Sequence, residues 1–168
     1  YFQGSDYNMS KVICNRGRVN LAVAVNAISV VRKIFHFEMA HAIDGYPGAC
    51  KNIHGHSYEL HVQVNSGNQS NEYIEGIGLA IDFKDIKNIV KNHIIDAFDH
   101  HLLLSKSYLS KNEALASSEN LIIWEMEPTA ENILIYIQKT LQGKWPKNCH
   151  LHQLTLFETK DSYAIWQA

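Results

Sequence analysis

Hydrophobic and polar residues alternate with a period of two in two parts of the first half of the chain. Residues 28–41 are rich in β-branched and aromatic side chains, and residues 56–66 repeat the alternation after a connection that contains glycine and proline. This alternation is typical of strands that bury one face, because successive side chains of a strand point to opposite sides. The two segments therefore predict a long β-hairpin.

Farther along the chain the hydrophobic period changes from two to about 3.6. Between Asp82 and Phe98 the apolar side chains fall on one stripe, which predicts an amphipathic helix capped by the Asp82 carboxylate. A second helix is predicted to begin after the cap residue Thr129 and to end at Gly143. The stripe of the first helix consists of Phe83, Ile86, Ile89, Val90, Ile94, Ala97 and Phe98.

The alternation returns at the C-terminal end, where residues 150–159 and 162–167 predict a second hairpin. Between the two helices, residues 105–118 predict a polar loop or an irregular excursion, and residues 120–124 predict a short strand. Two amphipathic helices need a sheet face to bury against. The predicted fold class is therefore α+β, with an antiparallel four-stranded sheet and two helices packed on one of its faces.

Composition narrows the class of protein. The chain has 168 residues, 46% of them hydrophobic and 19% charged, which fits one globular domain. Its formal net charge of -2 gives no electrostatic case for direct nucleic-acid binding, and no apolar run approaches the length of a membrane span. The three cysteines form an odd set without disulfide-framework spacing, which favours a reducing, cytoplasmic location.

The chain divides into three parts on the same evidence. Residues 1–5 are interpreted as the remnant of a protease-cleavable expression tag, residues 6–27 as an N-terminal extension, and residues 28–168 as the single domain. Within the extension, residues 21–27 are compatible with an extra strand or with a disordered leader.

Histidine is the one residue type in clear excess, with ten in the chain. By strand parity His54 and His56 point to one side, and the turn residues of the connection 42–53 can bring His41 back beside His54. Three neutral imidazoles with one open position make a catalytic zinc site. Spacing alone leaves two interpretations open, a metal site or strand histidines that face solvent by chance.

Six motifs in order along the chain carry a resemblance to a known family. They are Phe37-Glu38-Met39-Ala40-His41, Cys50-x3-His54-Gly55-His56, Asp82-Phe83, Asp99-His100, Pro128-Thr129-Ala130-Glu131-Asn132 and Glu158-Thr159. This set resembles the 6-pyruvoyltetrahydropterin synthase family, which includes the 6-carboxytetrahydropterin synthase of queuosine biosynthesis. The resemblance implies the tunnelling fold, in which sheets from several subunits join edge to edge into a barrel. It also implies a homo-oligomer, a hexamer built as a dimer of trimers.

The same resemblance implies a zinc-dependent lyase whose small-molecule substrate is 7,8-dihydroneopterin triphosphate. The reaction shifts protons along the substrate side chain and eliminates triphosphate, and the carboxy branch of the family also releases acetaldehyde. In the implied site His41, His54 and His56 are the zinc ligands, Cys50 is the general base, and Asp99 with His100 forms a proton-transferring dyad. Glu158 is the implied pterin anchor, and Thr129 is a further substrate-binding residue.

Each of these roles has a structural alternative. Cys50 can be an inert packed thiol, Asp99 and His100 a polar pair at a helix end, and Glu158 an ordinary exposed carboxylate. Asp82 has a capping role that needs no chemistry. Leu104 departs from the family pattern, since asparagine is common at that position.

Three residues separate Cys50 from His54, as in the carboxy enzymes of the family, and this spacing favours 6-carboxytetrahydropterin synthase. The alternatives are a 6-pyruvoyltetrahydropterin synthase and a zinc-binding protein without activity. A cysteine–histidine hydrolase is a further class, but it leaves the three-histidine set unused.

Overall fold

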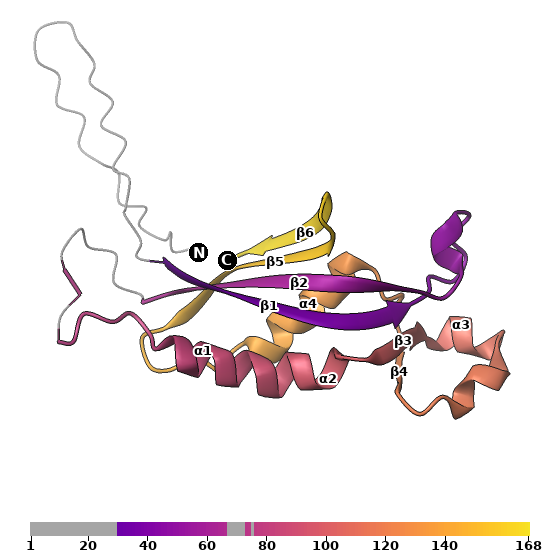
Figure 1. Ribbon diagram of the computed structural model, residues 1–168, viewed down its shortest axis with the longest axis horizontal. Coiled ribbons are helices and arrows are strands. Elements are labelled where there is room, and N and C mark those ends of the chain that lie inside the picture. Colours follow the sequence, from indigo (N-terminus) through magenta and orange to yellow (C-terminus); the bar gives the residue numbers. More distant parts are fainter. Residues whose placement is uncertain (1–29, 67–72, 75) are drawn as a thin grey trace, which may run out of the picture.

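A computed structural model describes residues 30–66, 73–74 and 76–168. The predicted tag remnant, the N-terminal extension with its two alternatives, and the first two residues of the first predicted strand lie outside the described residues. The described part holds a six-stranded sheet in the order β4-β3-β1-β2-β5-β6 (Figure 1). Its strands are β1 Val30–His41, β2 His54–Asn65, β3 His101–Ser105, β4 Leu121–Trp124, β5 His150–Thr159 and β6 Ser162–Gln167.

The prediction of a four-stranded antiparallel sheet is wrong, because the sheet is mixed and has two more strands, β3 and β4. The short strand predicted at residues 120–124 is present as β4. β1, β2, β5 and β6 pair antiparallel as predicted, whereas β3 runs parallel to β1 and β4 runs parallel to β3. β3 gives no period-two signal, since Leu103 and Leu104 are consecutive and both fully buried. Strands of a parallel ladder that are covered on both faces show continuous apolar runs instead of alternation.

Both predicted helices are present. The first is α1, Phe83–Val90, which continues through a π-helical turn, Lys91–Ile95, into α2, Asp96–Phe98. The second is α4, Ala130–Leu141. The Asp82 carboxylate accepts the Lys84 N–H at 2.7 Å, and the Thr129 hydroxyl accepts the Asn132 N–H at 3.3 Å. Both predicted caps are therefore confirmed.

The predicted polar loop at residues 105–118 is wrong, because this excursion contains two short helical segments. They are α3, Lys106–Ser110, and the 3-10 helix η3, Glu113–Ser117. Ser105 caps α3 by accepting the Tyr108 N–H at 3.0 Å. Neither segment contains a buried residue. They lack the apolar stripe that reveals a helix in a sequence.

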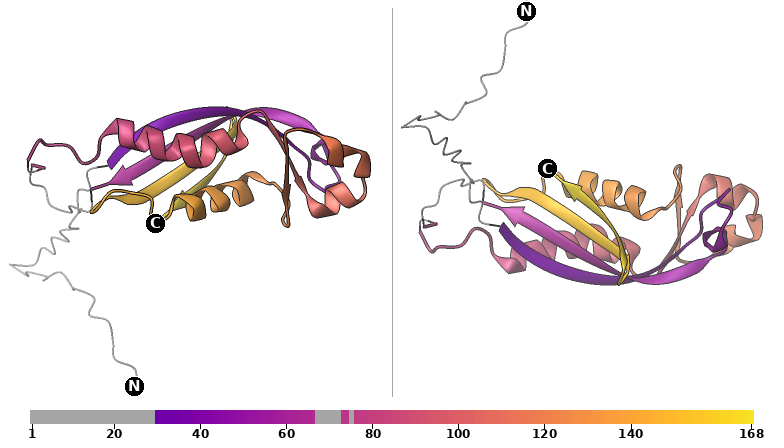
Figure 2. Two further views of the ribbon diagram at one scale, coloured as in Figure 1. Left: turned by 90° about the horizontal axis from the view of Figure 1, so that it is seen from below. Right: turned by 90° about the horizontal axis from the view of Figure 1, so that it is seen from above.

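The helices α1, α2 and α4 cover one face of the sheet, as predicted (Figure 2). The core lies between the two layers. Phe37 stacks on Tyr58 across β1 and β2 with ring centroids 5.1 Å apart, and Phe98 packs against Phe37 at 5.9 Å. His41 shares the strand parity of Phe37. The core face therefore continues directly into the face that carries the histidines.

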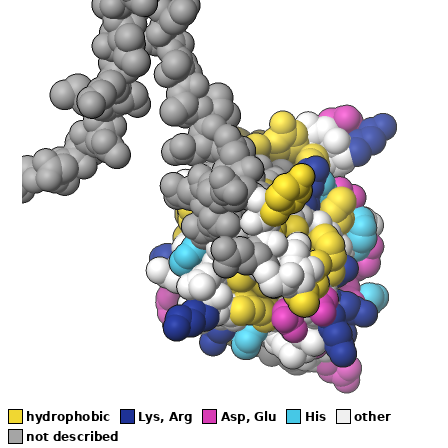
Figure 3. All heavy atoms as spheres, turned by 90° about the vertical axis from the view of Figure 1, so that its left-hand side faces the viewer, with side chains coloured by type: hydrophobic (Ala, Val, Ile, Leu, Met, Phe, Trp, Pro, Cys, Tyr) yellow, Lys and Arg dark blue, Asp and Glu magenta, His cyan; other side chains and the backbone are white. Residues whose placement is uncertain are grey.

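The surface at the end where α1 begins carries side chains of both charge signs between apolar ones (Figure 3). The exposed apolar residues of this region include Ile77, Leu79 and Phe83, and the Lys33 ammonium lies 5.9 Å from the centre of the Phe83 ring. Among the described residues, no helix is long and apolar enough to cross a membrane.

Candidate metal centre and active site

Three histidines converge at the end of the β1–β2 hairpin. His41 pairs directly with His54 across the two strands, and His56 pairs with Met39, so all three rings lie on the face that is continuous with the core. One nitrogen from each ring falls within 4.8 Å of the other two, and the Nε2 atoms of His41 and His54 are 3.2 Å apart. The convergence predicted from strand parity is confirmed, and the group can hold a metal ion.

Backbone carbonyls orient two of the three rings. His41 Nδ1 donates to the Pro128 carbonyl at 2.6 Å, and His54 Nδ1 donates to the Asn52 carbonyl at 2.9 Å. A carbonyl only accepts hydrogen bonds, so each Nδ1 carries the proton and each Nε2 keeps a free lone pair. Such partners around the ligands fix the ring orientation that a bound metal requires.

Burial favours the neutral form of two of the three rings, His41 and His56. It lowers the pKa of His41, which is 1% exposed, and the neighbouring Glu158 and the Pro128 carbonyl oppose this shift only in part. Burial also lowers the pKa of His56. Both rings are therefore neutral at pH 7, which is the form that binds metal. The buried Nε2 of His56 has no hydrogen-bond partner among the described residues, and a metal ion would satisfy it.

Glu158 lies against this group. Its Oε1 is 3.4 Å from His41 Nε2 and 3.7 Å from His56 Nε2, and the buried Tyr58 hydroxyl donates to the same oxygen at 3.4 Å. The β5–β6 pairing shifts register between Phe157 and Thr159, at Glu158 itself. Glu158 shares the strand parity of the buried Leu154 and Leu156. Its carboxylate borders the three histidines and is still about a quarter exposed, with a side-chain accessibility of 27%.

Tyr58 is a member of the site that the sequence analysis did not assign. Burial, followed by the charge of Glu158, raises the pKa of the Tyr58 hydroxyl, so it stays protonated and can donate to the carboxylate. The strand parity that joins Tyr58 to His54 and His56 is the signal that points to it. No spacing rule places Glu158 beside it, because the two residues meet only through the β2–β5 pairing.

Asp99 and His100 form the predicted dyad, with 3.0 Å between Asp99 Oδ1 and His100 Nδ1. The hydrogen bond from the Glu38 N–H to Asp99 at 2.9 Å, followed by His100, lowers the pKa of Asp99. The His100 N–H donates to the Glu38 carbonyl at 2.7 Å, and His100 adopts a left-handed φ of 60°. The dyad is thus fixed to the middle of β1 by two backbone hydrogen bonds.

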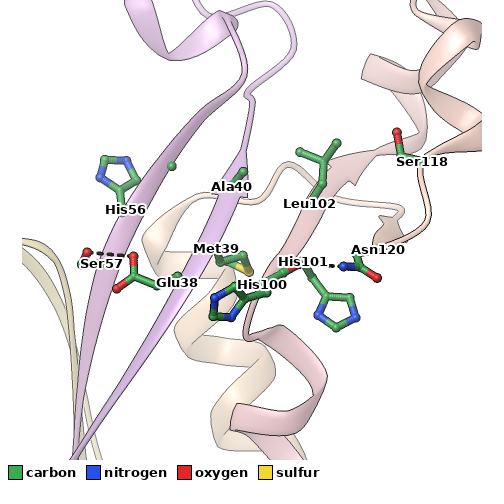
Figure 4. A pocket seen from close by; sticks show the side chains of 11 residues that line it. Glu38, Met39, Ala40, His56, Ser57, His100, His101, Leu102, Ser118 and Asn120 are labelled. Atoms are coloured by element: carbon green, nitrogen blue, oxygen red, sulfur yellow. Dashed lines mark hydrogen bonds between the residues drawn. The ribbon is translucent and has the colours of Figure 1, made fainter.

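His100 lines a cavity of about 480 Å³ that is also lined by Glu38, His56, Ser57 and Asn120 (Figure 4). Ser57 donates to the Glu38 carboxylate at 2.8 Å across the two strands. By strand parity Glu38 and Ser57 face away from His41 and His56. Within the described part of the chain, no hydrogen bond or ion pair joins the dyad to the three histidines.

Cys50 lies in η1, the 3-10 helix Ala49–Lys51, within the connection that leads from His41 to His54. Its thiol is free and half-buried, and its carbonyl accepts the Ile43 N–H at 2.9 Å. Thr129 directly follows Pro128, whose carbonyl holds His41, but its hydroxyl is engaged in capping α4. Cys50 thus lies between His41 and His54 in the sequence, and Thr129 follows the residue that binds His41. The roles of both residues in the chemistry stay predictions.

Comparison with known proteins decides the family. A family model described as 6-pyruvoyl tetrahydropterin synthase matches residues 30–168, a range that includes every residue the structure describes. The chain belongs to the 6-pyruvoyl tetrahydropterin synthase family. The resemblance carried by the six motifs is thereby confirmed.

Two curated relatives within the family carry a more specific name. The 6-carboxy-5,6,7,8-tetrahydropterin synthase of Haemophilus influenzae is 32% identical over 143 residues, which is 82% of this chain and 97% of the relative. The protein of the same name from Synechocystis is 30% identical over 139 residues, covering 80% of this chain and 90% of the relative.

Solved structures show that the fold is shared. The 6-pyruvoyl tetrahydropterin synthase of Plasmodium falciparum superposes with a TM-score of 0.62 at 21% identity, covering 85% of this chain and 99% of that one. An uncharacterized protein from Wolinella succinogenes, WS1659, superposes with a TM-score of 0.68 at 17% identity, covering 84% and 98%. The curled sheet with helices on one face is thus the family fold, which the sequence analysis named as the tunnelling fold.

Proposed function

We propose that this protein is a zinc-dependent 6-carboxy-5,6,7,8-tetrahydropterin synthase. It would convert 7,8-dihydroneopterin triphosphate and water into 6-carboxytetrahydropterin, acetaldehyde and triphosphate, as a cytoplasmic enzyme of queuosine biosynthesis. The observation that carries the proposal is the group of three histidine side chains with a partly exposed carboxylate beside it. The name shared by the curated relatives supports the carboxy branch of the family.

The Nε2 atoms of His41 and His54 and a nitrogen of His56 would hold the zinc and leave a fourth position open to substrate oxygens. A zinc ion in such a site supplies Lewis-acid stabilisation of negative charge that develops on a substrate oxygen. The protein contributes the neutral state of His41 and His56, and the Pro128 and Asn52 carbonyls orient the rings of His41 and His54.

Glu158 would bind the pterin ring, because a carboxylate pairs with the adjacent N–H groups of a 2-amino-4-oxo-pyrimidine through charge-assisted hydrogen bonds. Tyr58 donates to Oε1 of Glu158 from the buried side and so holds the carboxylate in place. Thr129 is proposed as a further substrate contact, from its place beside Pro128 at the start of α4.

The proton transfers are assigned to Cys50 and to the Asp99–His100 dyad. Cys50 would act as general base, since a thiol near a cationic metal site is readily deprotonated. Glu38, whose backbone holds the dyad, faces away from His41 and His56 by strand parity, and we therefore assign the dyad to the site of a neighbouring copy. An oligomer whose sheets join edge to edge would make this arrangement and would cover the edge strands β4 and β6. The hexamer, as a dimer of trimers, is the proposed state.

The proposal is tested by incubating the purified protein with 7,8-dihydroneopterin triphosphate and measuring triphosphate release. We expect release that stops when a chelator removes the metal and returns when zinc is restored. A protein that keeps zinc without releasing triphosphate would instead be an inactive member of the family. Release that is insensitive to the chelator would point to metal-independent cysteine chemistry.

A Glu158→Gln variant should mainly weaken substrate binding. The amide keeps one acceptor but loses the charge and presents a donor to the donor edge of the pterin. We expect a rise in KM of on the order of 10-fold, the equivalent of a charge-assisted hydrogen bond worth about 1.5 kcal/mol, with the zinc content retained. Steady-state kinetics measure it, and Asp161→Asn in the exposed β5–β6 turn is the control. An unchanged KM in the Glu158 variant would remove the anchor assignment.

A further inference from the structure

The connection between β1 and β2, residues 42–53, contains Cys50 and lies between His41 and His54 of the metal group. Asp44 joins this connection by hydrogen bonds to two other parts of the protein. The Asp44 carboxylate, 17% exposed, accepts hydrogen bonds from the Ser107 hydroxyl and from the Lys111 ammonium, the latter at 2.6 Å. The Asp44 N–H donates to the Glu127 carboxylate at 2.7 Å. Asp44 therefore contacts the α3 region and the start of α4 at once.

We propose that Asp44 and Glu127 are positioning residues that hold the Cys50 connection in register with the three histidines. Ile43, the neighbour of Asp44, donates its N–H to the Cys50 carbonyl at 2.9 Å. A shift of Asp44 is thus transmitted to the Cys50 backbone through one hydrogen bond. The inference rests on the proposed function, in which Cys50 transfers a proton at the metal centre.

The same segment that holds Asp44 also holds the metal group. Glu127 precedes Pro128, whose carbonyl accepts from His41 Nδ1 at 2.6 Å. The Glu127 carbonyl in turn accepts the Thr129 N–H and the Asn132 side-chain amide, both at 2.9 Å, which fixes Glu127 to the start of α4. Residues 127–128 therefore position both the His41 ring, through the Pro128 carbonyl, and the Cys50 connection, through the Glu127 carboxylate.

At its C-terminal end the connection is separated from the excursion 105–118 by a cavity. A cavity of about 600 Å³ lies between Asn52 and Ile53 on one side and residues 108–115 on the other. The attachment is concentrated at Asp44, where the hydrogen bond from Lys111, followed by that from Ser107, lowers the pKa of the carboxyl and keeps it ionised. The connection is consequently a loop whose position depends on a few charge-assisted hydrogen bonds.

The excursion also offers a matched control. Lys106 of the excursion pairs with Glu125, which follows β4. Both side chains are well exposed, at 63% and 72%, and neither has a hydrogen bond to the connection among the described residues. An exposed pair of this kind contributes little to stability. Removing it perturbs the same segment without releasing Asp44.

The proposal is tested with Asp44→Ala, Glu127→Ala and Lys111→Met, and with Lys106→Met as the control. In the first three variants we expect kcat to fall by about 10- to 100-fold, the effect of displacing a reacting group by about 1 Å, while KM and zinc content change less than about twofold. Amide hydrogen exchange at Ile43 and alkylation of Cys50 by iodoacetamide should both become faster. The buried Cys149 is the internal reference for alkylation, and Lys106→Met should match the wild type.

The rates of amide exchange at Ile43 and of Cys50 alkylation are measured without any enzymatic turnover. They therefore test the positioning of Cys50 even if the wild-type protein is inactive on the pterin substrate. The inference is overturned if Asp44→Ala leaves both rates and kcat within twofold of the wild type. It is also overturned if kcat falls only in proportion to lost zinc, because Asp44 would then support the metal group and not the thiol. If Asp44→Ala does not fold, Lys111→Met decides, since it removes one partner and leaves the Glu127 bond intact.

Discussion

A His54→Ala variant is expected to lose most of its bound metal, whereas the wild-type protein holds about one zinc ion per chain. A catalytic zinc needs three protein ligands, and His54 supplies the nitrogen that lies 3.2 Å from His41 Nε2. His54 is only partly buried, so its removal leaves the core intact. Metal content measured by mass spectrometry on the purified proteins gives the result, and turnover should fall with the zinc.

The matched control is His93→Ala, an exposed histidine of the π-helical turn that takes no part in the site. It should retain the zinc and the activity of the wild type. A wild-type protein that stays free of metal after growth with zinc, and that takes up none on titration, would refute the metal centre. Zinc retained in full by the His54 variant would refute the ligand assignment.

Cys50→Ala and His100→Ala should each reduce turnover by on the order of 10²–10⁴-fold while zinc content and fold are retained, because this is the usual contribution of a positioned general acid or base. Neither side chain contributes to the core: the Cys50 thiol is half-buried and the His100 ring is 74% exposed. Single-turnover kinetics measure the effect on the chemical step. Cys149→Ala, which changes a buried thiol away from the site, should keep its activity.

The assignment of the dyad to a neighbouring copy adds a second measurement to the same variants. If His100 serves a neighbouring copy, mixing the two inactive variants as co-assembled oligomers should restore part of the turnover, because some sites then combine an intact Cys50 with an intact His100. Full activity in the Cys50→Ala protein would withdraw the base assignment. Mixed oligomers that remain inactive would place the dyad in the site of its own chain.

The hairpin and its histidines were predictable because they depend on local periodicity. The alternation along residues 30–41 and 54–65 fixes which side chains share a face, and one antiparallel pairing then brings His41 opposite His54. The amphipathic stripe between Asp82 and Phe98 identifies its helix in the same way, although the π-helical turn inside it leaves no mark on the pattern.

The remaining features depend on contacts between segments far apart in the chain. β3 is a short apolar run that pairs parallel with β1, and no local period distinguishes it from a buried loop. Glu158 reaches the histidines only through the β2–β5 pairing. Asp99 and His100 are adjacent in sequence, but two hydrogen bonds fix them to the Glu38 backbone. These bonds join segments far apart in the chain, so no local pattern predicts them.

The most direct test of the account is identification of the products formed from 7,8-dihydroneopterin triphosphate by the zinc-loaded protein. The three-residue spacer between Cys50 and His54 sets where the thiol lies relative to the metal group, and a small displacement of a proton-transferring group redirects or slows the chemistry. Mass spectrometry should find 6-carboxytetrahydropterin and acetaldehyde in equal amounts. Accumulation of the 6-pyruvoyl compound without acetaldehyde would contradict the account and assign the protein to the other branch of the family.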